Sequence, residues 1–96
     1  MQQVRFEWDV KKNLQNQDKH GVSFEFAQHA FLDQYRVIAE DLDHSEREPR
    51  YFCFGKIKND ILTVRFTYRL HTIRIIGAGY WRKGKKIYEK ENSVHG

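Results

Sequence analysis

The stretch from Val64 to Lys86 limits the possible folds more than any other part of the chain. Apolar and polar residues alternate from Ile61 to Arg69, and again from Thr72 to Ala78, so we predict two consecutive strands. Successive side chains of a strand point to opposite faces, which puts Arg65 and Arg69 on the same face. The apolar face of this strand pair must be buried against another part of the chain. The arginine-bearing face is suited to bind phosphate groups.

Basic residues are unevenly distributed along the chain, and this says more than the formal net charge of +4. Residues 40–48 contain five acidic side chains and one arginine, whereas residues 56–90 contain ten basic and two acidic side chains. Such a separation is typical of a surface that binds nucleic acid or an acidic protein partner. The simpler alternative is a solvated basic face.

The length of 96 residues fits a single domain, which we expect to span residues 1–96. The one cysteine, Cys53, cannot form an internal disulfide and is expected to be a small core residue. The N-terminus has no apolar signal region, and no apolar run approaches the length of a membrane span. We therefore expect a cytoplasmic protein without a membrane partner.

The order of the predicted elements is one strand, two helices, four strands and a final helix, which indicates the α+β class. Asp9 is a good N-cap for the first helix and Gly21 suits its end, while Ser23 can cap the second. We expect the two N-terminal helices to cover a mostly antiparallel sheet of four to five strands, with Asn59-Asp60 as one turn. The predicted strands are Val4–Trp8, Tyr35–Leu42, Arg50–Lys58, Ile61–Arg69 and Thr72–Ala78; the predicted helices are Val10–Lys19, a segment from Ser23 through Phe31, and Arg82–Asn92.

If this face also acts on a bound phosphodiester, the site needs a proton acceptor, cations that hold the charge on phosphorus, and a proton donor for the leaving oxygen. Arg69 and Arg74 are the expected phosphate clamp, followed by Arg65, because a guanidinium stays charged and offers a planar fork to phosphate. His20 is the most attractive titrating group, since histidine titrates near neutrality. Further candidates for acid, base or RNA-binding roles are Lys19, Arg50, Tyr80, Trp81, Arg82, Lys83, Lys85, Lys86, Tyr88 and Glu89.

Several of these residues have a simpler structural interpretation. His20 beside Gly21 fits the end of a helix as well as it fits catalysis. Trp8 is better explained as core than as a platform for bases, whereas Trp81 is open between the two roles. Tyr88 fits the docking of the last helix, and Gly84 should weaken that helix by roughly 1 kcal/mol relative to alanine.

We expect no metal and no cofactor. His29, His44 and His71 lack the close carboxylate or cysteine spacing of a zinc site. The chain also has no glycine-rich phosphate loop and no nucleophile motif.

Residues of particular types stand at fixed spacings along most of the chain. They are Phe6, Trp8, Asp9, Lys12, Asn16, the run Lys19–Val22, Phe24, Ala27, Arg50, Gly55, Thr67, Arg69 and the run Arg74–Ile76. This pattern resembles the BrnT family, toxins of bacterial type II toxin–antitoxin pairs. The resemblance implies a RelE-like fold, RNA cleavage that inhibits translation, and inhibition by a BrnA-like antitoxin with a DNA-binding part.

One position departs from the family pattern. After Arg74-Ile75-Ile76 the family commonly has Ser-Ala-Arg, whereas this chain has Gly77-Ala78-Gly79. If the missing arginine contacts the scissile phosphate, the protein is a weaker nuclease or Arg82 has taken its place. Two other functions therefore remain open: a non-catalytic RNA- or ribosome-binding module, and a basic socket for an acidic partner.

Overall fold

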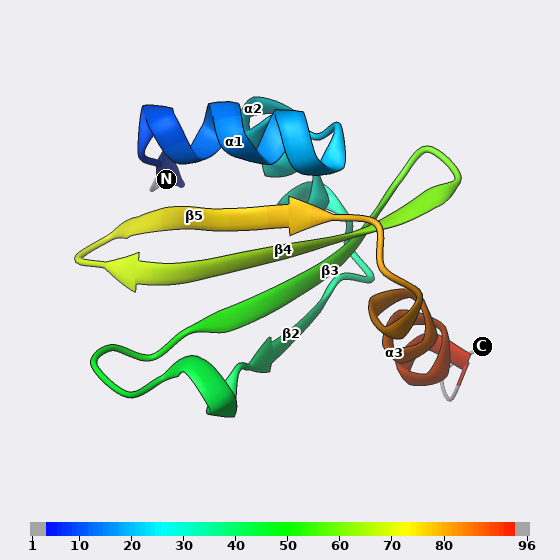
Figure 1. Ribbon diagram of the computed structural model, residues 1–96. Coiled ribbons are helices and arrows are strands. Elements are labelled where there is room, and N and C mark those ends of the chain that lie inside the picture. Colours follow the sequence, from blue (N-terminus) through cyan, green and yellow to red (C-terminus); the bar gives the residue numbers. More distant parts are fainter. Residues whose placement is uncertain (1–3, 94–96) are drawn as a thin grey trace.

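A computed structural model describes residues 4–93 and contains a five-stranded mixed sheet with helices on both faces (Figure 1). The strand order is β1-β5-β4-β3-β2. The elements are β1 (Arg5–Glu7), α1 (Val10–His20), α2 (Phe24–Ala27), the 3-10 helix η1 (Gln28–Leu32), β2 (Val37–Glu40), the 3-10 helix η2 (Leu42–His44), β3 (Tyr51–Ile57), β4 (Asp60–Arg69), β5 (Thr72–Gly79) and α3 (Arg82–Ser93). The α+β class predicted from the sequence is confirmed.

The four strands from β2 to β5 form an antiparallel meander, in which each strand pairs with the next one along the chain. Strand β1 joins the sheet at its other edge and runs parallel to β5, so that Glu7 lies opposite Arg74. A register shift between Arg65 and Phe66 marks a β-bulge in the β4–β5 pair. The turn between β3 and β4 is formed by Lys58-Asn59, one residue earlier than predicted, and Lys58 has a positive φ of 58°.

The expectation that two N-terminal helices cover the sheet is wrong. Helix α2 is a single turn of four residues that continues directly as η1, and η1 rather than α2 makes most of the contact with β3. A Cβ at Gly55 would overlap with the carbonyl of Ala30, so the backbone of η1 lies directly on the strand. A regular longer helix with side chains between it and the sheet would not fit this close approach.

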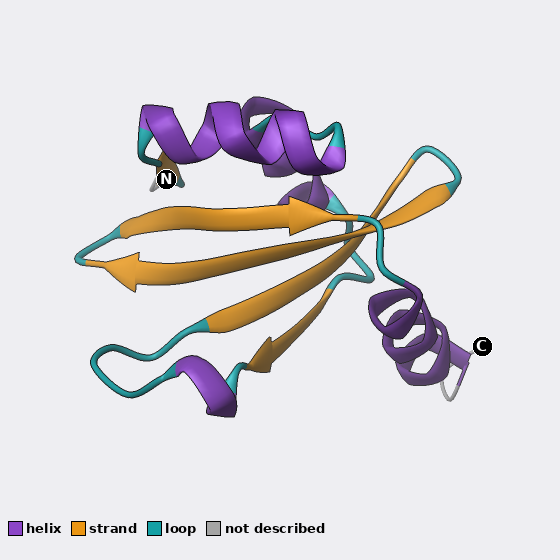
Figure 2. Cartoon of the chain, viewed as in Figure 1, coloured by secondary structure: helices purple, strands orange, loops and turns teal. Residues whose placement is uncertain are grey.

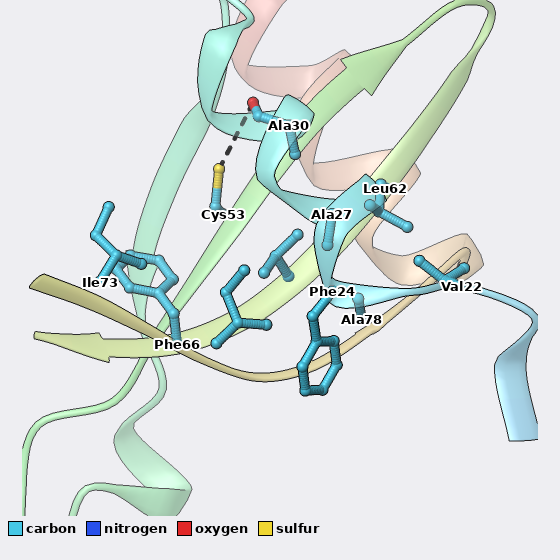
Figure 3. Packing of buried hydrophobic residues seen from close by; sticks show 11 residues of the cluster. Val22, Phe24, Ala27, Ala30, Cys53, Leu62, Phe66, Ile73 and Ala78 are labelled. Carbon is cyan, nitrogen blue, oxygen red and sulfur yellow. Dashed lines mark hydrogen bonds between the residues drawn. The ribbon is translucent and has the colours of Figure 1, made fainter. Parts of the chain in front are cut away.

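The main core lies between the sheet and the elements α1, α2 and η1 (Figure 3). Phe24, Leu62 and Phe66 are fully buried there. Cys53 is also fully buried, as predicted, with its sulfur 3.9 Å from the carbonyl oxygen of Ala30. Burial raises the pKa of its thiol to about 12, which makes the thiolate unavailable at neutral pH.

A smaller core lies on the opposite face, under α3, and contains Phe54, Ile61 and Tyr88. Helix α3 comes close to the sheet because of Gly84: a Cβ there would overlap with Thr63 Oγ1 and lie 2.9 Å from Phe54 Cδ1. Gly84 therefore does more than weaken a helix, since it allows the helix to pack. Figure 2 shows α3 on the side of the sheet that α1 and α2 leave open.

No helix between residues 4 and 93 is both long enough and apolar enough to cross a membrane.

Candidate functional site

The three arginines predicted as a phosphate clamp share one face of the sheet. Arg65 and Arg69 are on β4, and Arg74 lies on β5 opposite Thr67, which stands between the two β4 arginines. This is the face opposite α1 and η1. Helix α3 covers it only at the far end, over Phe54 and Ile61, so the arginines remain partly exposed.

Each of these arginines is paired with a carboxylate of the same chain. The nitrogen–oxygen distances are 3.4 Å from Arg65 to Asp41, 3.6 Å from Arg69 to Glu48 and 2.6 Å from Arg74 to Glu7. The Arg69–Glu48 pair is the longest and the most exposed of the three, and exposed ion pairs typically contribute only ~0–1 kcal/mol. The arginines are thus on one side, as expected, but they are not free cations.

A polar pocket of about 560 Å³ lies where the loop between β2 and β3 meets the end of β4. Its lining residues are Asp43, His44, Glu46, Arg47, Glu48, Arg50 and Arg69. The loop is fixed by short hydrogen bonds: Ser45 Oγ donates to the carbonyl of Asp41 (2.6 Å) and accepts from the amide of Arg50 (3.0 Å). Thr67 Oγ1 on β4 donates to the carbonyl of Pro49 (2.7 Å), which attaches the loop to the arginine face.

His44, which the sequence did not single out for chemistry, lines this pocket and is oriented by the buried carboxylate of Asp41. Its Nδ1 lies 2.9 Å from Oδ2 of Asp41, whose side chain is only 5% exposed. Burial favours the protonated form of Asp41, but the hydrogen bond from His44 and the charges of His44 and Arg65 outweigh it, so the pKa of Asp41 is lowered. Asp41 therefore stays ionised and binds both the His44 ring and the Arg65 guanidinium.

The pairing follows from the local backbone. Asp41 directly precedes the 3-10 helix η2, and His44 is the last residue of that helix. The amide of His44 donates to the carbonyl of Asp41 (3.3 Å), and this single turn brings the two side chains together. The only trace of it in the sequence is Asp-x-x-His, a spacing too common to single out His44.

The other candidates lie at the opposite end of β5. Strand β5 has eight residues, so Thr72 and Gly79 are roughly 23 Å apart at ~3.3 Å per residue. Arg69 pairs with Thr72, whereas α3 starts just after Gly79, and Figure 1 shows the two ends well separated. The candidates placed near α3 or the end of α1 are Lys19, His20, Tyr80, Trp81, Arg82, Lys83, Lys85 and Lys86. The predicted residues thus form two groups instead of one site.

In the second group, His20 packs edge-on against the indole of Trp81, with ring centroids 5.1 Å apart. The same indole lies over Gly79, where a Cβ would be 2.7 Å from the ring. An arginine at position 79 would force Trp81 to move. Burial, and secondarily the charge of Asp60, raise the pKa of Tyr80, so its hydroxyl is a poor base.

Tyr88 is engaged in holding α3. Its hydroxyl donates to Asp33 Oδ2 (2.6 Å), and the side chain is 8% exposed. Burial and the hydrogen bond to Asp33 raise its pKa to about 12. The structure does not bring Tyr88 together with the strand arginines.

Most of the N-terminal residues that carry the family resemblance have a structural role. Asp9 caps α1 by accepting from the amide of Lys12 (3.0 Å), and Gly21 ends it with a φ of 69°. Trp8 packs edge-on against Phe24. Asn16 is buried and bonds to Ala78 on β5. These contacts hold α1 on the sheet.

A second hollow, of about 1040 Å³, lies on the other face of the sheet. Its lining includes the apolar residues Phe31, Ile38, Tyr68 and Leu70 and the basic residues Arg5 and Arg36. It is separate from the polar pocket. Within residues 4–93, no three histidine, cysteine, aspartate or glutamate side chains are grouped as a metal site would require.

The fold and the site define a small α+β protein that carries three partly exposed arginines on one sheet face, beside a polar pocket lined by three arginines and three carboxylates. Residues 8–84 match the family described as the ribonuclease toxin, BrnT, of a type II toxin-antitoxin system, and the chain belongs to this family. No curated protein matches the chain. Membership implies a toxin with ribonuclease activity, an RNA substrate and a protein antitoxin as partner.

Proposed function

We propose that this protein cleaves RNA without a metal ion and inhibits translation, and that the cleavage site is the polar pocket together with the adjoining arginine face. The observation that carries the proposal is the common orientation of Arg65, Arg69 and Arg74 beside a pocket that also contains Arg50. Guanidinium groups on two neighbouring strands can hold two oxygens of one phosphate.

Arg69 is the central member of the proposed clamp because it belongs both to the arginine face and to the pocket. Its pair with Glu48 is long (3.6 Å) and partly exposed, so an RNA phosphate can replace the carboxylate. Arg74 is more tightly held, by Glu7 at 2.6 Å, and we assign it to orienting the backbone of the bound RNA. Arg82, Lys83, Lys85 and Lys86 would bind more distant phosphates of the same strand.

The proposed partner is a BrnA-like antitoxin with a DNA-binding part, and the proposed place of action is the cytoplasm, where translation occurs. A RelE-like arrangement of helices and sheet is part of the same proposal. These three proposals follow from the family. The antitoxin is tested by isolating the complex formed with the product of an adjacent reading frame.

The test is incubation of the purified protein with single-stranded RNA in the presence of a chelator. Cleavage should persist in chelator, and Arg69→Ala should lower the rate on the order of 10²–10³-fold, as for the loss of one preorganised donor. Lys90→Ala, which removes a charge at the far end of α3, is the matched control. Cleavage that stops in chelator and returns with added metal contradicts the metal-independent mechanism.

A second function is favoured by the three carboxylates already paired with the strand arginines. A face that accepts Asp41, Glu48 and Glu7 can also accept acidic side chains of a protein, which makes it a basic socket for an acidic partner segment. The lack of the family arginine at Gly79 leaves room for a related possibility, an RNA- or ribosome-binding module without cleavage. Salt-sensitive RNA binding without cleavage indicates the module, and an absence of RNA affinity at low salt indicates the socket.

A further inference from the structure

We propose that His44 is the proton acceptor of the cleavage reaction and that Asp41 is its positioning residue. The inference rests on the proposed RNA cleavage and adds the group that the arginine clamp does not supply. It replaces His20, which the sequence had suggested for this role.

The first argument is the orientation of the imidazole ring. Nδ1 of His44 lies 2.9 and 3.1 Å from the two carboxylate oxygens of Asp41. An ionised carboxylate accepts only, so the neutral ring carries its proton on Nδ1 and leaves the lone pair of Nε2 free. A buried aspartate that fixes the tautomer of a histidine base is a recurrent catalytic arrangement.

The second argument is that Asp41 is held in place from several sides. Its amide donates to the carbonyl of Arg50 (2.7 Å), its own carbonyl accepts from Ser45 Oγ (2.6 Å), and its carboxylate contacts Arg65 (3.4 Å). A carboxylate with so little freedom can hold a partner ring in one orientation. The ring itself is 58% exposed, so RNA can reach it.

The third argument concerns the residues that line the pocket together with His44. Arg50 and Arg69 line the same cavity, whose volume of about 560 Å³ falls within the ~300–1,000 Å³ usual for ligand pockets. A phosphate bound by Arg69 would therefore present its neighbouring ribose to His44. His20 lies away from this pocket, because it packs on Trp81 at the other end of β5.

The step is an internal transesterification. Nε2 of His44 takes the proton of the ribose 2′-hydroxyl while O2′ forms a bond to phosphorus. The bond from phosphorus to the 5′-oxygen breaks, and that oxygen takes a proton from water in the open pocket. The products are a 2′,3′-cyclic phosphate and a 5′-hydroxyl, and His44 returns its proton to water. Arg69 holds the charge on the five-coordinate phosphorus.

The experiment compares His44→Gln, His20→Gln and His71→Gln in chelator, with the thermal unfolding of each variant as a check of folding. His71, in the turn between β4 and β5, is the control because it lies outside the polar pocket. His44→Gln should lower the cleavage rate on the order of 10²–10⁴-fold, as for loss of a general base, while the other two keep wild-type rates. Added imidazole should partly restore His44→Ala but not Arg69→Ala.

The role of Asp41 is tested by the ring nitrogens of His44, which nuclear magnetic resonance distinguishes. The wild-type ring should be protonated at Nδ1 in its neutral form, and Asp41→Asn should shift it towards the other tautomer. A folded Asp41→Asn with an unchanged tautomer and rate overturns the positioning role.

The outcomes separate the two proposals. If the wild type cleaves RNA and His44→Gln cleaves equally well, His44 is not the base, although the proposed function stands. If the wild type cleaves no RNA, both proposals fail. A loss in His20→Gln with none in His44→Gln returns the role to His20.

Discussion

The side-chain amide of Asn16 binds both backbone groups of Ala78, as a neighbouring strand would. Its Nδ2 donates to the carbonyl of Ala78 (2.9 Å), and its Oδ1 accepts from the amide of Ala78 (3.1 Å). Strand β1 pairs with β5 only from Thr72 to Arg74, so the outer edge of β5 lacks a strand partner at Ala78. Asn16 also donates to the carbonyl of Val22 (2.8 Å), which fixes the end of α1.

Asn16→Ala should therefore destabilise the protein by about 2–6 kcal/mol, because it leaves the buried amide and carbonyl of Ala78 without partners at ~1–3 kcal/mol each. Urea unfolding measures the change. Gln15→Ala, at an exposed position of the same helix, should change stability by less than about 0.5 kcal/mol. Equal stabilities of the two variants would show that α1 does not depend on this contact.

Gly84→Ala should destabilise the protein although alanine is the better helix former. The added Cβ overlaps with Thr63 Oγ1 and approaches Phe54. Overpacking costs ~1–3 kcal/mol and the helix gains roughly 1 kcal/mol, so we expect a net loss of up to about 2 kcal/mol. Lys85→Ala, on the exposed side of α3, is the control for helix propensity. An increase in the melting temperature of Gly84→Ala would mean that α3 can move away from the sheet at no cost.

The hydrogen bond between Tyr88 and Asp33 should make stability depend on pH at both extremes. The pKa of Tyr88 is raised from 10.0 to about 12, so its contribution is complete below pH 10 and is lost as the pH rises through 12. Burial favours protonated Asp33, but the bonds from Tyr88 and the amide of Lys56 outweigh it and lower its pKa below 3.8. That contribution is present above pH 3.8 and is lost as the pH falls further.

Tyr88→Phe removes the tyrosine side of this linkage. Its unfolding free energy should stay flatter between pH 10 and 12 than that of the wild type, and it should lose less on acidification. Guanidinium unfolding at acidic, neutral and alkaline pH measures how the unfolding free energy changes at each end of the pH range. Tyr68→Phe, which alters an exposed hydroxyl, should retain the wild-type profile.

Substitutions among the strand arginines and among the basic residues of α3 should affect different kinetic quantities. Arg69→Ala should lower kcat, because this residue adjoins the pocket. The double variant Lys83→Ala, Lys86→Ala should leave kcat unchanged, weaken binding and reduce the salt dependence of RNA affinity by roughly 0.7 in slope per lost contact. The reverse result, with kcat falling in the lysine variant, would place the chemistry near α3.

The sequence allowed the individual elements to be predicted, because their patterns are local. The alternation in β4 and β5 and the caps of α1 at Asp9 and Gly21 are of this kind. The parallel pairing of Arg5 with Thr72 has no local trace, and neither has the docking of η1 on Gly55. Both depend on how distant segments pack.

The candidate site divides in the same way. Alternation along β4 was enough to place Arg65 and Arg69 together. It could not show that acidic residues of the β2–β3 loop reach these arginines, since that loop appeared only as a charged connection. His44 was overlooked for the same reason: its partner Asp41 becomes significant only when η2 forms and buries it.

The pairing of Glu7 with Arg74 joins positions that are 67 residues apart, and within residues 4–93 β1 has no other strand beside it. In a nascent chain, β1 and α1 can therefore pack on the sheet only after β5 has been made. A protein of such long-range connectivity folds late and slowly compared with one built from local contacts. Arg74 itself lies on β5, so a partly made chain cannot yet present the complete arginine surface.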